Sequence, residues 1–122
     1  MKVLIVDDSR ATRAILKRIL KPLGCVCVEA ADGRKGLDAL AEHPDVVVAL
    51  VDWNMPNMDG LQFIQAVRSN DDNDDVLLMM VTTESEIQRV SYAMDAGANE
   101  YIVKPFTQDI ITQKLRLLGL DV

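Results

Sequence analysis

The feature that most constrains this chain is a strict alternation between short apolar runs and segments with helical periodicity. The first run, Val3 to Val6, is rich in β-branched residues, and apolar residues then recur at helical spacing from Ile15 to Leu20. We expect strands at residues 3–6, 25–30, 46–51, 77–81 and 101–103, a helix between Ser9 and Pro22, and helices at about residues 34–42, 61–69, 85–96 and 108–118. This alternation predicts an α/β fold, a doubly wound parallel sheet of five strands with helices on both faces.

Length and composition are those of one globular domain. The chain has 122 residues, of which 49% are hydrophobic, so we expect a single domain over residues 1–122. A net charge of −6, with no dense run of lysine and arginine, argues against a nucleic-acid surface. No apolar run approaches the roughly 18 residues that a membrane span needs. Cys25 and Cys27 are expected to stay reduced, which fits a cytoplasmic protein.

Polar side chains stand where four of the expected strands end. The carboxyl ends of parallel strands meet at one edge of a doubly wound sheet, and ligands bind there. The residues delivered to that edge are Asp7 and Asp8, Asp52, Thr82 and Thr83, and Lys104. The sequence therefore predicts that carboxylates, hydroxyls and an ammonium group converge at one edge.

This set of groups suits phosphoryl transfer to a carboxylate. Clustered carboxylates are costly when they are buried together, and a hard cation such as Mg²⁺ removes that cost. Asp52 would then be the nucleophile, two acids would hold Mg²⁺, and Lys104 and Thr82 would contact phosphoryl oxygens. Taken singly, Asp52 and Lys104 are also ordinary turn residues, and Asp7 and Asp8 are ordinary acids at a helix entry. The coincidence of four strand ends favours the functional interpretation.

Other motifs are weaker. Asp71, Asn73 and Asp75 have the spacing of a calcium loop, but Val76 stands where that loop requires glycine, so we interpret the segment as a solvated loop. His43 is the only histidine and has no serine or cysteine partner, which argues against a triad hydrolase. The glycine-rich nucleotide-binding motifs are absent from the sequence.

Four motifs in order resemble those of one family. They are "VDDS" at Val6 to Ser9, "DWNMPNMDG" at Asp52 to Gly60, "VTTE" at Val81 to Glu84, and "YIVKPF" at Tyr101 to Phe106. Over essentially its whole length the chain resembles the receiver domains of two-component response regulators, in particular the single-domain chemotaxis regulators. The resemblance implies strand order 2-1-3-4-5, a monomer without an output domain, and a phosphoacceptor switch rather than an enzyme. Its only chemistry would be self-phosphorylation from small phosphodonors and autodephosphorylation.

The resemblance also assigns roles at the site. It implies that Asp52 accepts a phosphoryl group from a histidine kinase. Asp8, Asp52 and the backbone carbonyl of Asn54 would bind Mg²⁺, with Asp7 helping through water. Lys104 would contact the phosphoryl group, and its peptide bond to Pro105 would be cis.

Two further sets of residues follow from the resemblance. Thr82 would swing toward the phosphoryl group and vacate space into which Tyr101 turns. The side chains of Asn54 and Glu84 would tune how fast water removes the phosphoryl group, and both are the residue types of regulators that signal briefly.

The output surface would comprise the expected helix 85–96, strand 101–103 and helix 108–118, including Ile87, Val90, Tyr101 and Lys114. The stripe of Ile87, Val90 and Met94 either binds a partner helix or packs on the sheet, and the sequence leaves both open. Expected partners are the kinase, a flagellar motor switch protein and a phosphatase. Ile87 replaces a lysine typical of motor binders, and Thr83 replaces a small alanine, so the output partner stays open.

Two other functions remain as alternatives. One is a stand-alone or excised receiver that serves a phosphorelay outside chemotaxis or acts as a phosphate sink. The other is an aspartyl-phosphate phosphatase on the same fold, which would need an acid two residues after the nucleophile. That position is Asn54, so the phosphatase hypothesis lacks its acid catalyst.

Overall fold

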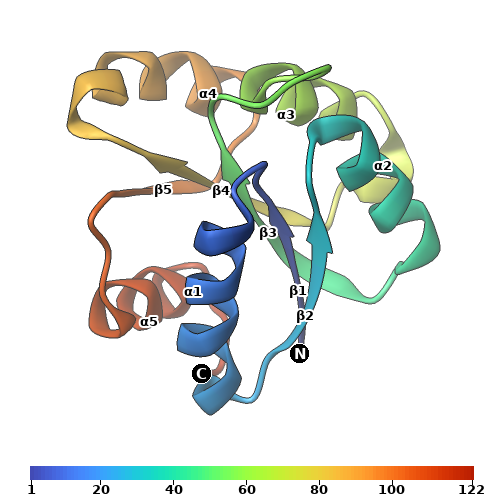
Figure 1. Cartoon of the computed structure of the whole chain (residues 1–122). Helices are drawn as coiled ribbons and strands as arrows, with labels where there is room; N and C mark the ends of the chain where they lie inside the picture. The colour runs from blue at the N-terminus through green and yellow to red at the C-terminus, as the bar shows by residue number, and fades with distance from the viewer.

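One parallel sheet organises the computed structural model, which describes residues 1–122. The five strands are β1 (Lys2–Val6), β2 (Val26–Ala30), β3 (Val46–Asp52), β4 (Leu77–Thr82) and β5 (Glu100–Val103). Their order is β2-β1-β3-β4-β5, and every neighbouring pair is parallel (Figure 1). The predicted doubly wound fold and its strand order are therefore confirmed.

Five helices cover the two faces of the sheet. They are α1 (Arg10–Leu20), α2 (Gly33–Glu42), α3 (Gly60–Arg68), α4 (Val90–Ala96) and α5 (Gln108–Leu117). One core cluster includes Leu16 of α1 and Ile111 of α5, so these two helices share a face. The other cluster joins Leu40, Phe63 and Ala93, so α2, α3 and α4 cover the opposite face (Figure 1).

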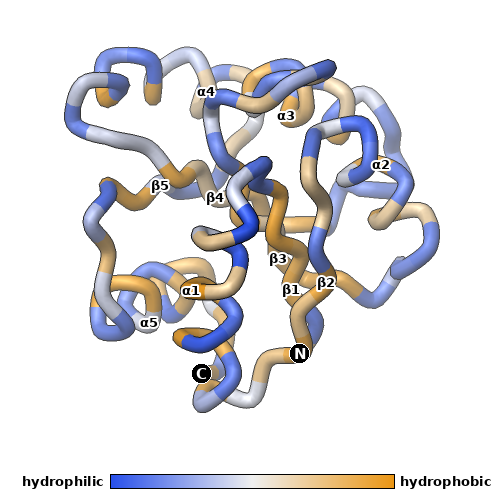
Figure 2. The backbone as a smooth tube through the Cα atoms, in the orientation of Figure 1, coloured by the Kyte–Doolittle hydropathy of each residue, from blue (hydrophilic) through white to orange (hydrophobic).

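The central strands are buried on both faces, as a parallel sheet between two helical layers requires. In β1, Val3 and Ile5 belong to the core that α1 and α5 cover, whereas Leu4 and Val6 belong to the other core. All four side chains are fully buried. Figure 2 shows the hydrophobic character running along β1 and β3. The polar residues that follow these strands are thus positioned by strands that are packed on both faces.

The segment expected as a helix over residues 85–96 differs from the prediction. A 3-10 helix, η3 (Glu84–Arg89), comes first, and α4 itself begins only at Val90. Glu86 N donates to the carbonyl oxygen of Thr83 at 3.0 Å, which is the short-range bond of a 3-10 turn. The Thr83 hydroxyl bonds the side chains of Ser85 and Glu86 instead of a backbone N–H. Local side-chain bonds of this kind compete with regular helix and explain the difference.

The turn after β3 is closed tightly against the end of the strand. Asp59 caps α3 in a capping box with Gln62. Gly60 N donates to the carbonyl oxygen of Trp53 at 2.8 Å. A Cβ at Gly60 would overlap the carbonyl oxygen of Asp52 and lie 3.1 Å from the Cα of Trp53. Only glycine fits, because the obstacle is backbone.

Candidate functional site

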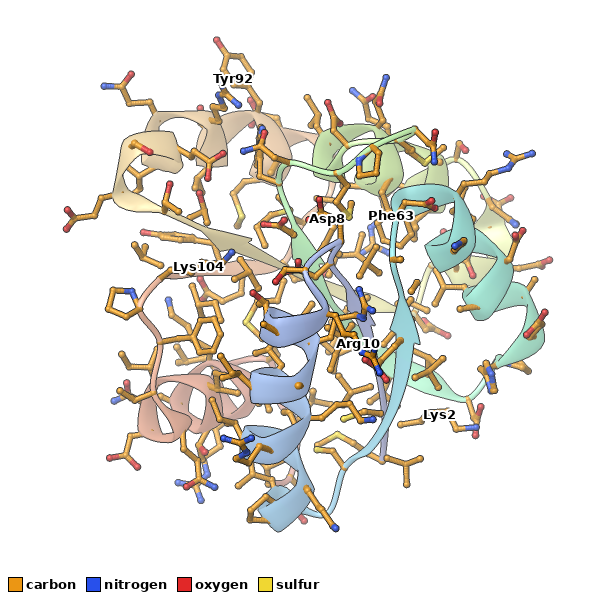
Figure 3. The ribbon with its side chains drawn as sticks, viewed as in Figure 1. Lys2, Asp8, Arg10, Phe63, Tyr92 and Lys104 are labelled. Atoms are coloured by element: carbon orange, nitrogen blue, oxygen red, sulfur yellow. The ribbon has the colours of Figure 1, made fainter.

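Three aspartates converge at the carboxyl ends of two neighbouring strands. Asp7 and Asp8 follow β1, Asp52 is the last residue of β3, and these strands are paired in the sheet. One carboxylate oxygen from each aspartate lies within 4.8 Å of the others. Figure 3 shows Lys104 reaching from the end of β5 toward the turn that carries Asp8. The structure thus brings together the acids and the lysine that the sequence places at this edge.

Asp7 is the most buried of the three, with 2% of its surface exposed. Its Oδ1 accepts a hydrogen bond from Ser9 N at 2.8 Å, but its Oδ2 is buried and has no hydrogen-bond partner. Burial raises the pKa of Asp7 above its ordinary value. Arg13 Nη1 donates to the Asp7 carbonyl oxygen at 2.6 Å, which fixes the backbone here. An unpaired buried carboxylate oxygen is costly, so this atom is suited to a cation or its water shell.

Asp52 has the most strongly perturbed carboxyl group of the site. Burial, together with the nearby negative charge of Asp7, raises the pKa of Asp52 to about 6. The Lys104 ammonium opposes this shift, but its Nζ lies 3.6 Å from Asp52 Oδ1, which is longer than a hydrogen bond. The Asp52 side chain is 13% exposed. Asp52 is therefore accessible to a reactant and incompletely neutralised by the protein.

These features fit Mg²⁺. Carboxylate and carbonyl oxygens are the ligands that Mg²⁺ prefers, and the three aspartates supply both charge and a free oxygen. Two positive charges at this position would relieve the repulsion that raises the pKa of Asp52. The residues present thus match the expected cofactor.

Thr82 and Tyr101 lie on the adjoining strands. Thr82 is completely buried, and its hydroxyl has only a long contact of 3.4 Å with the carbonyl oxygen of Thr83. Tyr101 is partly buried, with Lys114 Nζ 5.0 Å from the centre of its ring. Lys114 also forms an ion pair with Glu100 at 3.1 Å. The Thr82 hydroxyl is therefore weakly bound, whereas Tyr101 is packed by a side chain from α5.

Asn54 and Glu84, the two residues expected to tune the loss of the phosphoryl group, have different surroundings in the structure. Asn54 Nδ2 donates to Glu86 Oε2, and Glu84 is exposed. Sequence reasoning missed Glu86. The signal was present, because Thr83 and Glu86 have the T-x-x-E spacing of a capping box.

The stripe of Ile87, Val90 and Met94 is divided between core and surface. Val90 is buried at 7% exposure, whereas Ile87 is 42% and Met94 is 39% exposed. Val90 therefore packs inside, and the accessible apolar surface here consists of Ile87 and Met94. Tyr92, which lies on α4 with Met94, is also exposed.

Two smaller features complete the description. The Lys104–Pro105 peptide bond is cis, as the resemblance implied. A membrane-crossing helix would have to be longer and more apolar than any helix in this structure.

Comparison with known proteins identifies the family. The response regulator receiver domain matches residues 3–116. The chemotaxis protein CheY homolog of Campylobacter jejuni is 45% identical over 116 residues, covering 94% of this chain and 89% of the relative. Chemotaxis protein CheY1 of Helicobacter pylori is 41% identical over 119 residues, covering 97% and 96%. The solved structure of chemotaxis protein CheY4 of Vibrio cholerae has a TM-score of 0.87 at 33% identity, covering 95% of this chain and 96% of that one.

Receiver domains of this type are signalling switches rather than conventional enzymes, and they typically bind Mg²⁺. The match extends over nearly the whole chain in sequence and in structure. This chain belongs to the response regulator receiver domain family.

Proposed function

We propose that this receiver domain accepts a phosphoryl group on Asp52 from a histidine kinase and then presents the surface of α4, β5 and α5 to a partner. The observation that carries the proposal is the position of Asp52, which ends β3 beside two other carboxylates and an ammonium group. These are the groups needed to orient and neutralise a transferring phosphoryl group.

The chain's residues divide the chemistry among them. A carboxylate oxygen of Asp52 attacks phosphorus, the bond from phosphorus to the donor atom breaks, and the donor leaves with its electron pair. Lys104 Nζ, 3.6 Å from Asp52 Oδ1, is placed to contact a phosphoryl oxygen. Asp8, Asp52 and the carbonyl of Asn54 would hold Mg²⁺ directly, with Asp7 acting through water. Bound there, Mg²⁺ supplies positive charge to the phosphoryl oxygens.

The response begins at Thr82. Its hydroxyl has only a 3.4 Å contact and is available to a phosphoryl oxygen on the neighbouring strand. Movement of Thr82 would open space for Tyr101, which Lys114 now packs from α5. The phosphoryl charge thereby changes the shape of the surface formed by α4, β5 and α5.

The output we propose is chemotaxis, through a flagellar motor switch protein. The relatives named above are chemotaxis proteins, and Ile87 of η3 and Met94 of α4 form an exposed apolar surface. The alternative is a phosphorelay outside chemotaxis or a phosphate sink. The side chains of Asn54 and Glu84 are proposed to set a short phosphate lifetime, with a phosphatase as a further partner.

Phosphorylation is tested directly with acetyl phosphate and Mg²⁺. Intact-mass analysis should show the gain of one phosphoryl group, and the fluorescence of Trp53, the only tryptophan, should change. Asp52→Asn should abolish the mass gain, whereas Asp38→Asn, at an exposed position on α2, should keep it. A wild-type protein that gains no phosphoryl group, or an undiminished gain in Asp52→Asn, would contradict the proposal.

The output is tested separately by binding to a peptide from a flagellar motor switch protein. Beryllium fluoride and Mg²⁺ should raise the affinity of wild-type protein for this peptide at least about tenfold. This factor lies within the usual range of allosteric coupling, which begins at about fivefold. An unchanged affinity would favour the phosphorelay or phosphate-sink alternative. The phosphoacceptor role of Asp52 would then still stand.

A further inference from the structure

One glutamate, assigned no role by the sequence, joins the two loops that flank the site. Glu86 Oε2 accepts a hydrogen bond from Asn54 Nδ2, and Glu86 Oε1 accepts one from Thr83 Oγ1 at 2.9 Å. Asn54 stands two residues after Asp52, and Thr83 directly follows Thr82. We call this arrangement of Glu86, Asn54 and Thr83 the Glu86 bridge. It connects the loops that leave the paired strands β3 and β4.

A second contact joins the same two segments. The Arg89 guanidinium lies 5.9 Å from the centre of the Trp53 ring, and Trp53 itself is buried. Arg89 ends η3, and Trp53 directly follows Asp52. The segment that leads into α4 is therefore held at both its start and its end by residues beside the phosphoacceptor. Side-chain contacts thus hold η3, which leads into α4 of the output surface, against the loop after β3.

The Glu86 bridge must respond when Thr82 moves. Thr83 follows Thr82 in the chain, and its carbonyl oxygen accepts a hydrogen bond from Glu86 N at 3.0 Å. A shift of Thr82 toward a phosphoryl group therefore displaces Thr83 relative to Asn54, which belongs to a different loop. One carboxylate cannot keep both hydrogen bonds if their donors separate. Bonds to a carboxylate are about twice as strong as bonds between neutral groups, so their loss opposes the movement.

We propose that Glu86 is a positioning residue that holds the resting state of the switch, and that phosphorylation must break the Glu86 bridge. The proposal rests on the proposed function, since it assumes that Thr82 moves toward a phosphoryl group on Asp52. It extends that function by naming the contact that opposes switching. It also gives Asn54 a partner in the resting state, which keeps its side chain engaged with η3.

Three variants separate the bridge from a general effect on the helix. Glu86→Ala removes both acceptor oxygens. Glu86→Gln keeps the bridge, because the amide oxygen accepts from Asn54 and the amide nitrogen donates to the Thr83 oxygen. Gln88→Ala is the matched control, since Gln88 is an exposed residue of the same 3-10 segment.

Affinity for beryllium fluoride in excess Mg²⁺, followed by Trp53 fluorescence, measures the cost of switching. Glu86→Ala should bind roughly three- to tenfold more tightly than wild type, the factor expected when a partly exposed hydrogen bond stops opposing the change. Glu86→Gln should lie between wild type and Glu86→Ala, because its neutral amide keeps both hydrogen bonds but makes them weaker. Gln88→Ala should stay within about twofold of wild type. An affinity of Glu86→Ala equal to wild type overturns the proposal. So does a Glu86→Gln variant that behaves like Glu86→Ala, because the negative charge rather than the bridge would then be responsible.

Hydrogen exchange without any phosphodonor tests the bridge independently of phosphorylation. The backbone amides of residues 84–90 should exchange roughly three- to tenfold faster in Glu86→Ala, because one connection to the loop after β3 is lost. Gln88→Ala should exchange as wild type does, and Glu86→Gln should lie between wild type and Glu86→Ala. Unchanged exchange in Glu86→Ala overturns the bridge itself. If wild-type protein fails to bind beryllium fluoride, the proposed function and the switching role of Glu86 both fail, whereas the exchange result still decides whether the contact holds η3.

Discussion

Two clusters of polar side chains in this molecule have opposite properties. The first is the site at Asp7, Asp8, Asp52 and Lys104. The second, which we call the Arg68 corner, consists of Arg68 at the end of α3 and the groups it binds. Arg68 donates to the carbonyl oxygens of Gly97 and Asn73 and to Asn99 Oδ1, at 2.9, 3.1 and 2.8 Å. Asn99 Oδ1 also accepts from Leu78 N at 2.8 Å, so the corner joins α3 to the strands.

The difference lies in whether polar atoms have partners. Arg68 directs each of its three donor nitrogens at an acceptor, whereas Asp7 Oδ2 has none and the Asp52 carboxylate lies 3.6 Å from its nearest cation. Polar groups with partners contribute to stability, and unpaired ones detract from it. The corner therefore stabilises the fold, while the site is held in place by the rest of the molecule and remains open to a ligand.

The largest effect is expected from the Arg68 corner. Arg68→Ala should lower the free energy of unfolding by about 2–3 kcal/mol, because the acceptors on Asn99, Gly97 and Asn73 lose a shared donor. Urea denaturation measures this change. Arg116→Ala is the control, since Arg116 bonds only the chain end at Val122 and should cost less than about 0.5 kcal/mol. Phosphorylation of folded Arg68→Ala should persist, and equal losses from the two variants would contradict the comparison.

At the site, removing a charged group should raise the free energy of unfolding instead of lowering it. The pH dependence of stability tests this expectation. The pKa of Asp52 is raised from 3.8 to about 6, so between these values the folded state binds more protons than the unfolded state. Without divalent cations, the contribution of Asp52 to stability should therefore fall as pH rises through this window and stay low above pH 6. Asp52→Asn should remove the part of the slope that is due to Asp52, leaving the part due to Asp7, and should be more stable than wild type by about 2 kcal/mol at neutral pH. Equal slopes in chemical denaturation across pH would contradict this expectation.

Asp7→Asn tests whether the unpaired oxygen serves the cation. Affinity for Mg²⁺, followed by Trp53 fluorescence, should fall at least about tenfold, while stability in a chelator should stay the same or rise by up to about 1 kcal/mol. Asp38→Asn, at an exposed acid on α2, is the control and should change neither value. A variant that loses stability without losing affinity would place Asp7 with the Arg68 corner rather than with the site.

The smallest effect is expected where polar groups have partners but lie at the surface. Lys17 and Arg13 both pair with Glu29 at 3.1 Å, and the Lys17 side chain is 49% exposed. Lys17→Ala should lower the free energy of unfolding by no more than about 0.5 kcal/mol, and less at high salt. Denaturation at two salt concentrations measures both values. A loss as large as that of Arg68→Ala would show that exposure to solvent does not make these ion pairs weaker than the hydrogen bonds of the Arg68 corner.

The fold and the core of the site were predictable from the sequence for the same reason. Buried strands are continuous apolar runs, and in a parallel sheet their ends meet, so the residues after each run are necessarily neighbours. The acids and Lys104 were found in this way. The roles assigned to them remain predictions.

What the sequence did not predict depends on contacts between loops. The bond from Asn54 to Glu86 joins side chains 32 residues apart, and no periodicity places one loop against another. The 3-10 form of residues 84–89 depends on local bonds of Thr83 that compete with helix. Likewise, the i, i+3, i+7 spacing did not show that Val90 is buried while Ile87 and Met94 are exposed. That spacing assumes one regular α-helix, whereas Ile87 lies in η3 and α4 begins at Val90.

Gly60 shows that a residue without a functional side chain can tolerate as few substitutions as a catalytic residue. Its backbone has no left-handed angle, so helix propensity alone would favour alanine there. The carbonyl oxygen of Asp52 nevertheless occupies the place of a side chain. In a library that samples every substitution and is selected only for folding, position 60 should be depleted of all other amino acids. A map of the substitutions that each position tolerates would then identify the end of β3 from folding alone, before any assay of signalling was made.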